Sequence, residues 1–188
     1  MRPSHFLASL PNFISLARLA LVPLAIMMIA QSRWDAAFGV FVAAGVSDAI
    51  DGFLAKRFDL QTELGAYLDP IADKALLVSI YVALAVGSVI PSEIAILVVA
   101  RDVMIIGAIV LSFLMGRPVE IRPLFVSKLN TTVQIIVAAL VLAAKALHWT
   151  TGLWFHTALL LVAVLTVASA AAYLAQWFVH MTAGRRPG

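Results

Sequence analysis

Residues 92–116, SEIAILVVARDVMIIGAIVLSFLMG, form an apolar run of the length that a membrane-spanning helix requires. At 1.5 Å rise per residue, a helix needs about 20 mostly apolar residues to cross the hydrocarbon core of a bilayer. Pro91 precedes the run and Gly116 ends it, as is typical of helix boundaries. The run therefore predicts one transmembrane helix, in which Glu93, Arg101 and Asp102 are the charged residues.

Five other segments of the chain are similarly long and apolar, and turn-forming residues separate them. They cover residues 13–31, 34–56, 66–89, 125–147 and 152–179. We therefore expect an all-α integral membrane protein with six transmembrane helices, in which residues 1–188 form one membrane domain.

The composition supports a membrane protein over a soluble one. Apolar residues make up 63% of the chain and charged residues 12%, whereas soluble domains carry about 45–50% and about 25%. The absence of cysteine excludes a disulfide scaffold, a cysteine-ligated metal site and thiol catalysis. The 13 basic residues are scattered between apolar runs and form no continuous stripe, so we expect no nucleic-acid partner.

The basic residues are divided unequally between the two ends of the predicted spans. Six spans put both termini on one side. The basic residues on that side are Arg2, Lys56, Arg57, Arg117, Arg122, Lys128, Arg185 and Arg186, and those on the other side are Arg33 and Lys145. The positive-inside rule then predicts a multi-pass protein of the inner or plasma membrane, with both termini and the active site in the cytoplasm.

Four of the acidic residues gather at one place in this pattern. Asp48 and Asp51 are three residues apart near the end of the second span, and Asp69 and Asp73 are four apart near the start of the third. These spacings place each pair on one helical face, and the short connection predicts that the two helices are antiparallel neighbours. A charge at the centre of a span costs about 2.5–3.5 kcal/mol even on lenient scales, so we expect these carboxylates to have a function.

Neighbouring carboxylates stay ionised only where cations compensate them, because like charges in a low dielectric raise one another's pKa. Two Mg²⁺ or Mn²⁺ ions with oxygen ligands meet this need, and two-metal carboxylate sites catalyse phosphoryl transfer. Two alternatives remain open. The acids could form structural ion pairs with Lys56, Arg57, Lys74 and Arg101, or they could serve as a relay in a small transporter.

Residues 48–56, DAIDGFLAK, and 65–73, GAYLDPIAD, together resemble the signature of the CDP-alcohol phosphatidyltransferases, D-x2-D-G-x2-A-R-x8-G-x3-D-x3-D. Lys56 stands where the family usually has arginine, which keeps the charge but loses the bidentate fork for phosphate. The resemblance implies the six-helix fold of that family and an enzyme that releases CMP.

The resemblance also implies roles for individual residues. Two metal ions would be held by Asp48, Asp51, Asp69 and Asp73, and Asp73 would also act as the general base. The CDP group of CDP-diacylglycerol would be bound by Asn12, Ser15, Arg18, Gly52, Ala55, Lys56 and Gly65.

The acceptor alcohol is predicted from the second half of the chain. Residues 69–74, 90–91, 100–104 and 126–134 resemble the cardiolipin synthases of the mitochondrial type, which use phosphatidylglycerol. Phosphatidylglycerolphosphate synthases of the family carry G-K-x-K-T-x-x-Q in the fifth helix, where this chain has Ser127 and the neutral Asn130. Because the dianion glycerol 3-phosphate requires a dense basic cluster, we expect phosphatidylglycerol as the acceptor. A phosphatidylglycerolphosphate synthase remains the alternative.

Four residues are candidates for binding the acceptor: Arg101, Lys128, Thr131 and Gln134. The last three share a helical face, whereas Arg101 and Asp102 are equally well explained as a buried structural pair. Relatives form homodimers and surfaces of small residues permit close helix packing, so we also expect a homodimer.

Overall fold

The computed structural model describes residues 5–58, 63–116 and 124–183, with side chains described for 16–50, 72, 74–116 and 124–182. In this part of the chain the regular structure is all helical. The six helices are α1 (His5–Ala30), α2 (Trp34–Phe58), α3 (Glu63–Val86), α4 (Ser92–Leu114), α5 (Phe125–Ala146) and α6 (Leu153–Ala183). The predicted all-α class is therefore confirmed.

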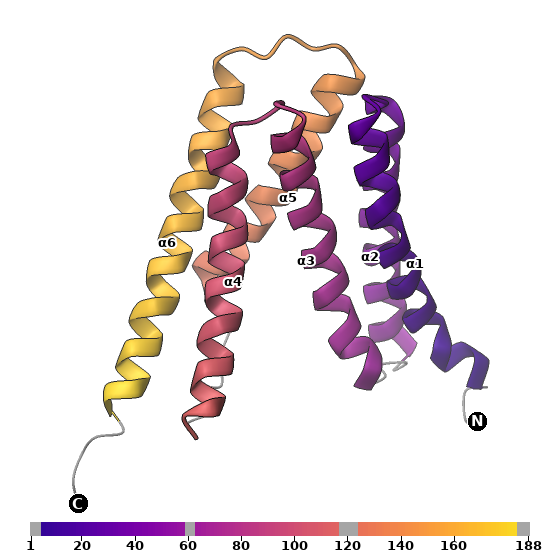
Figure 1. The fold of residues 1–188 in the computed structure, drawn as a ribbon. Helices are drawn as coiled ribbons and strands as arrows, with labels where there is room; N and C mark the ends of the chain where they lie inside the picture. Colours follow the sequence, from indigo (N-terminus) through magenta and orange to yellow (C-terminus); the bar gives the residue numbers. More distant parts are fainter. Residues whose placement is uncertain (1–4, 59–62, 117–123, 184–188) are drawn as a thin grey trace, which may run out of the picture. The chain divides into compact units, whose positions relative to one another are not determined.

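The helices fall into two compact units. The first unit comprises Met1–Ile90 and Ala138–Thr150, and within it α1 packs against both α2 and α3 (Figure 1). Apolar side chains fill its core, including Ala44, Ile80 and Leu84, each at most 1% exposed. The end of α5 joins this unit, where the Lys145 ammonium lies 5.6 Å from the centre of the Trp34 ring.

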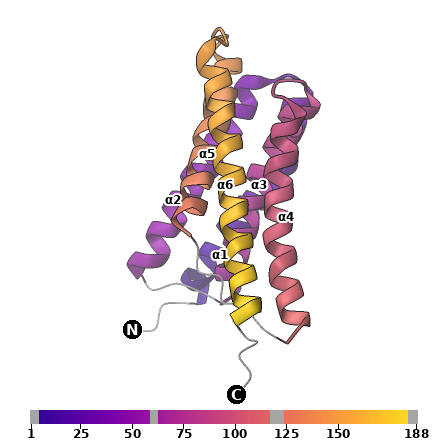
Figure 2. The same cartoon turned by 90° about the vertical axis from the view of Figure 1, so that its left-hand side faces the viewer.

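The second unit comprises Pro91–Val137 and Thr151–Gly188. Within it α4 and α6 pack side by side (Figure 2). Its core mixes apolar side chains such as Val98 and Val162 with the buried hydroxyl groups of Ser112, Thr166 and Ser169. Buried hydroxyls need hydrogen-bond partners, and the functional candidates supply several of them.

Helices α1 and α3 end in turns that satisfy their own carbonyl groups. After α1, the N–H of Ser32 donates to Ile29 O and that of Arg33 donates to Met28 O, both at 2.9 Å. Ser88 and Val89 repeat this Schellman pattern after α3. Ser32, Ser88 and also His148, after α5, have φ values of 53–55°, in the left-handed region that closes such a turn.

Three helices in the described part of the chain are long and apolar enough to span a membrane: Ser92–Leu114, Phe125–Ala146 and Leu153–Thr182. Two shorter apolar stretches, Leu16–Ala30 and Lys74–Val86, accompany them. Large apolar side chains project outward from these spans, such as Phe113, which is 73% exposed. The protein is therefore a membrane protein, and the full set of six spans stays a prediction.

The helix boundaries differ from the predicted spans at both ends of the chain. α1 begins at His5 rather than near residue 13, and α6 continues to Ala183 rather than ending near residue 179. Hydropathy marks the apolar part of a helix, whereas backbone hydrogen bonding continues into its polar ends.

Candidate active site

The first unit contains a buried arginine paired with one of the predicted metal ligands. Arg18 on α1 is 1% exposed, and its Nη1 lies 2.8 Å from Oδ1 of Asp48 on α2. A guanidinium is buried among apolar helices only where hydrogen bonds and an opposite charge compensate its lost hydration. The Asp48 side chain is 48% exposed, so solvent and further cations still reach the carboxylate.

The backbone places the other donor-side residues on the same three helices. Asn12 and Ser15 lie on α1, Asp51, Gly52, Ala55 and Lys56 on α2, and Gly65, Asp69 and Asp73 on α3. The side chains of these nine residues lie outside the described part of the structure. The described side chains include no group of three or more His, Asp or Glu residues that could hold a metal ion. The predicted metal site therefore stays a prediction.

The second unit is organised around Arg101, a predicted acceptor ligand on α4 that is 5% exposed. Its Nη1 pairs with Asp102. Its Nη2 donates to Ser127 Oγ on α5 and, at 2.9 Å, to Ser169 Oγ on α6. The ring centre of Tyr173 lies 5.7 Å from the guanidinium carbon. Arg101 therefore joins α4, α5 and α6 through one buried side chain.

These contacts use much of the hydrogen-bonding capacity of Arg101. The Nε group also donates to Ser169 Oγ, at 3.3 Å, so all three nitrogens of the guanidinium have protein partners. The Asp102 side chain is 14% exposed, which limits its stabilisation by water. The geometry favours the structural alternative for the Arg101 and Asp102 pair, in which it orients the surrounding helices.

A second buried polar group connects α5 to α6. Gln134 Nε2 donates to Thr166 Oγ1 at 3.1 Å, and Thr166 Oγ1 donates to Asn130 Oδ1 at 3.0 Å. The three residues are 0–3% exposed. Asn130 Nδ2 is buried and has no hydrogen-bond partner among the described residues. This group supplies neutral hydrogen-bonding atoms in an apolar region.

The predicted acceptor face on α5 changes from exposed to buried along the helix. Lys128 is exposed, Thr131 is half-buried and Gln134 is buried. Their spacing of three residues places them on roughly one face of α5, and of the three only Lys128 is exposed. The face can offer a cation at one end and neutral groups at the other.

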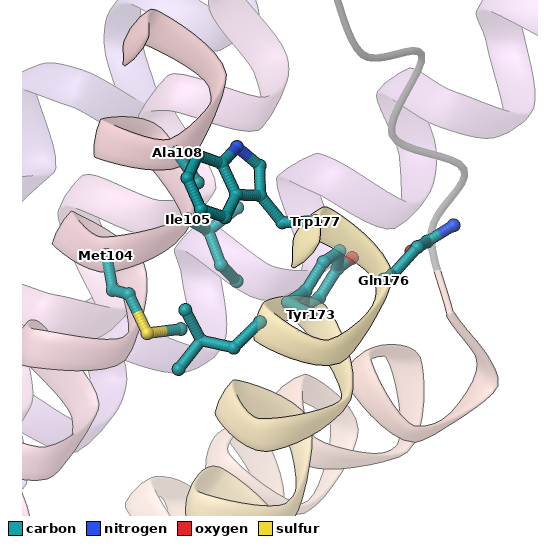
Figure 3. A pocket seen from close by; sticks show the side chains of 7 residues that line it. Met104, Ile105, Ala108, Tyr173, Gln176 and Trp177 are labelled. Carbon is teal, nitrogen blue, oxygen red and sulfur yellow. The ribbon is translucent and has the colours of Figure 1, made fainter. Parts of the chain in front are cut away.

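A small cavity lies between α4 and α6, and Tyr173 is among the residues that line it (Figure 3). Its volume is about 10 Å³, which is room for about one water molecule. The Trp177 ring lies against Ile105 and Ala108 (Figure 3), and its Nε1 donates to Ser112 Oγ at 2.7 Å. The cavity is too small for a lipid or a nucleotide and reflects helix packing.

Sequence analysis missed the polar residues of α6. Thr166, Ser169 and Tyr173 lie on one helical face, because their spacings of three and four residues match the helical repeat, and all three contact the polar residues of α4 or α5. Their spacing within an otherwise apolar span was a signal that could have identified them.

The sequence profile of the CDP-alcohol phosphatidyltransferases matches residues 8–168. The chain belongs to this family. Membership favours the transferase over the alternative of a small transporter.

Curated relatives within the family carry two kinds of name. The CMP-forming cardiolipin synthase of Homo sapiens is 33% identical over 88% of this chain. The chloroplastic CDP-diacylglycerol–glycerol-3-phosphate 3-phosphatidyltransferase 1 of rice (Oryza sativa subsp. japonica) is 31% identical over 88% of this chain. The aligned regions cover 60% of the human protein and 56% of the rice protein.

A bacterial relative is covered more fully. The CDP-diacylglycerol–glycerol-3-phosphate 3-phosphatidyltransferase of Bacillus subtilis (strain 168) is 31% identical over 71% of this chain and 77% of its own length. The identities are too similar to separate the two acceptors, so the acceptor must be inferred from individual residues.

The contacts of Arg101 predict a large effect on stability. The substitution Arg101→Met removes the guanidinium that lies 2.5 Å from Asp102. Losing one partner of a buried ion pair costs about 3–5 kcal/mol, and we expect a loss of this size in the free energy of unfolding. Arg101→Lys keeps the charge but loses the planar fork, so its loss should be intermediate.

Denaturant unfolding of the purified protein in detergent measures these losses. The exposed neighbour Val103, at 62% exposure, provides a matched control, and Val103→Ala should change stability by less than about 0.5 kcal/mol. An Arg101→Met protein as stable as the parent would contradict a structural role for the pair.

Proposed function

We propose that this protein transfers the phosphatidyl group of CDP-diacylglycerol to a hydroxyl of phosphatidylglycerol, which forms cardiolipin and releases CMP. Family membership supports the nucleotide-activated donor. The assignment of phosphatidylglycerol as the acceptor rests on Asn130, which is uncharged and fully buried in the hydrogen-bonded group of α5 and α6.

The donor half of the proposal rests on α1, α2 and α3. Arg18 brings a fixed positive charge to the carboxylate of Asp48, and an arginine in this position can also contact a pyrophosphate. Asn12 and Ser15 precede it by six and three residues on α1, which places the three residues on roughly one helical face. Gly52, Ala55, Lys56 and Gly65 complete the proposed CDP site.

The donor set fits a pair of hard divalent cations. Asp48, Asp51, Asp69 and Asp73 offer only carboxylate oxygens, the ligands that Mg²⁺ and Mn²⁺ prefer, and the Asp48 carboxylate remains half exposed beside its arginine. When bound, the two ions would neutralise these carboxylates and withdraw charge from the pyrophosphate. Arg18 provides part of the same compensation from the protein itself.

The reaction then follows from the positions of the proton and of the leaving group. Asp73 takes the proton from the acceptor hydroxyl, whose oxygen forms a bond to the lipid-side phosphorus. The bond from that phosphorus to the bridging oxygen breaks, and CMP leaves with the electron pair. Arg18 and Lys56 stabilise the negative charge that grows on the departing phosphate.

A neutral acceptor site suits a lipid better than a free phosphate ester. Glycerol 3-phosphate brings two negative charges from water, whereas the phosphodiester of phosphatidylglycerol brings one and is held by its acyl chains. Asn130 is uncharged and fully buried, so this part of α5 adds no positive charge for a dianion. A dianion such as glycerol 3-phosphate requires several cations at its binding site, whereas a lipid phosphodiester does not.

Other residues of α5 complete the proposed acceptor site. Lys128 is exposed and can meet a single phosphate charge, while Thr131 and Gln134 continue the same face. Arg101 supports this site by holding α4, α5 and α6 together, so we assign it a positioning role.

The membrane arrangement is part of the proposal. Six spans would place both termini and the carboxylates in the cytoplasm, with residues 1–188 as one membrane domain. We also propose a homodimer, because Gly39 and Ala43 expose small side chains on α2 where another helix can approach closely.

The first prediction concerns Arg18. We expect Arg18→Gln to lower kcat/KM for CDP-diacylglycerol by about 10²-fold, because it removes a preorganised charge beside the pyrophosphate. Its free energy of unfolding should change by no more than about 1 kcal/mol, since the partner carboxylate is half exposed and screened. CMP release and denaturant unfolding measure the two effects, and unchanged turnover with lowered stability would make Arg18 a packing residue only.

The second prediction concerns the proposed general base. Asp73→Asn keeps the shape of the side chain but cannot accept the proton, so turnover should fall by about 10²–10⁴-fold while the protein stays folded. Asp35→Asn, at an exposed position in the first turn of α2, is the matched control and should retain parental activity. Full activity in Asp73→Asn would contradict the assignment of the base.

The third prediction separates the acceptors. Purified protein given CDP-diacylglycerol and a divalent ion should release CMP with phosphatidylglycerol and not with glycerol 3-phosphate. A chelator should abolish this release, and added Mg²⁺ or Mn²⁺ should restore it. CMP release with glycerol 3-phosphate alone would establish the alternative enzyme, and no release with either acceptor would refute both.

A further inference from the structure

An apolar groove lies in the first unit, away from the proposed catalytic residues. Its volume is about 460 Å³. Side chains of α1 and α3 form its walls, including Ile26, Ile29, Val78 and Val82. The groove is bounded at one end by Ser32 and Trp34, which belong to the turn after α1 and the start of α2.

Two cations lie at this end of the groove. Arg33, between Ser32 and Trp34, is exposed, and no ion pair joins it to another described residue. The Lys145 ammonium lies 5.6 Å from the centre of the Trp34 ring. The nearby acid, Asp35, is exposed in the first turn of α2, where the helix dipole favours a negative charge.

We infer that this groove binds an anionic membrane phospholipid, with one acyl chain between α1 and α3 and its phosphate beside Arg33 and Lys145. An apolar groove within membrane-embedded helices stays filled, because its lining loses dispersion contacts when it is empty. Basic side chains at the ends of apolar helices attract anionic headgroups, and tryptophan favours the same depth.

The charges favour a lipid over a second copy of this chain. In a two-fold dimer each copy presents the same surface to the other. If the two-fold axis passed through this patch, Arg33 and Lys145 of one copy would lie near the same cations of its partner. A negatively charged phosphate is attracted by all of these groups, whereas a second copy would be repelled.

This lipid site is separate from the proposed active site. Trp34 and Asp48 are 14 residues apart on α2, which corresponds to about 20 Å along the helix axis. The bound lipid is therefore not the one that reacts at the carboxylates, and the inference does not depend on the proposed reaction.

Fluorescence quenching of Trp34 tests the inference on the full chain. The variant Trp149→Phe, Trp154→Phe, Trp177→Phe leaves Trp34 as the one tryptophan. It is reconstituted in phosphatidylcholine vesicles that contain brominated phosphatidylglycerol or equally brominated phosphatidylcholine. The relative affinity from quenching should favour phosphatidylglycerol by at least about fivefold, because each basic side chain near a headgroup strengthens anionic binding by about that factor.

Two sets of variants separate the headgroup from the acyl chain. In the same background, the double variant Arg33→Gln, Lys145→Gln should lose the preference for phosphatidylglycerol over phosphatidylcholine. The double variant Arg33→Lys, Lys145→Arg keeps both charges and should retain the preference. Ala83→Phe, which fills the groove, should weaken quenching by both lipids. Ala171→Phe, at an exposed position on α6, is the matched control and should leave quenching by both lipids unchanged.

Two outcomes would overturn the inference. Equal quenching of Trp34 by the two lipids in the parent would show that the cations select no headgroup. Crosslinking between copies through Val82→Cys, introduced into this cysteine-free chain, together with protection of Trp34 from both lipids, would identify a second copy as the occupant.

Discussion

The burial of a positive charge at Arg18, beside Asp48, sets the electrostatics of the first unit. A guanidinium that is 1% exposed loses most of its hydration, and such a loss is tolerated only where the protein returns hydrogen bonds and opposite charge. α1 packs against α2 and α3, the helices that carry the predicted metal ligands, and its Arg18 reaches Asp48 directly. Packing and charge compensation are therefore achieved by the same side chain.

The second unit uses buried polarity differently. Arg101 and the group formed by Asn130, Thr166 and Gln134 connect α4, α5 and α6 through side-chain hydrogen bonds. Between membrane-embedded helices the hydrophobic effect contributes little to association, and packing and hydrogen bonds determine which helices meet. One cationic centre and one neutral centre then give α5 two chemically different regions on a single helix.

Much of this arrangement was predictable from the sequence because hydropathy and spacing are local properties. The six helices and the shared face of Lys128, Thr131 and Gln134 follow from local patterns. The pairing of Arg18 with Asp48 was not predicted, because it joins two different helices. The hydrogen-bond partners of Arg101 could not be predicted in this way. Ser169 is 68 residues away from Arg101 in sequence, and their contact depends on which helices pack together. The start of α1 was also missed, because Pro11 marks a helix boundary in sequence, whereas α1 begins at His5 and continues through this proline, as membrane-spanning helices tolerate.

The turns after α1 and α3 bear on how the chain enters a bilayer. Each turn satisfies its last carbonyl groups through its own N–H groups, so few of its backbone polar atoms need water. The backbone of such a reversal crosses the hydrocarbon layer at lower cost than that of an open loop, because unsatisfied backbone groups are costly there. Helices on either side of such a reversal can therefore be translocated together as a pair during synthesis, rather than one after the other.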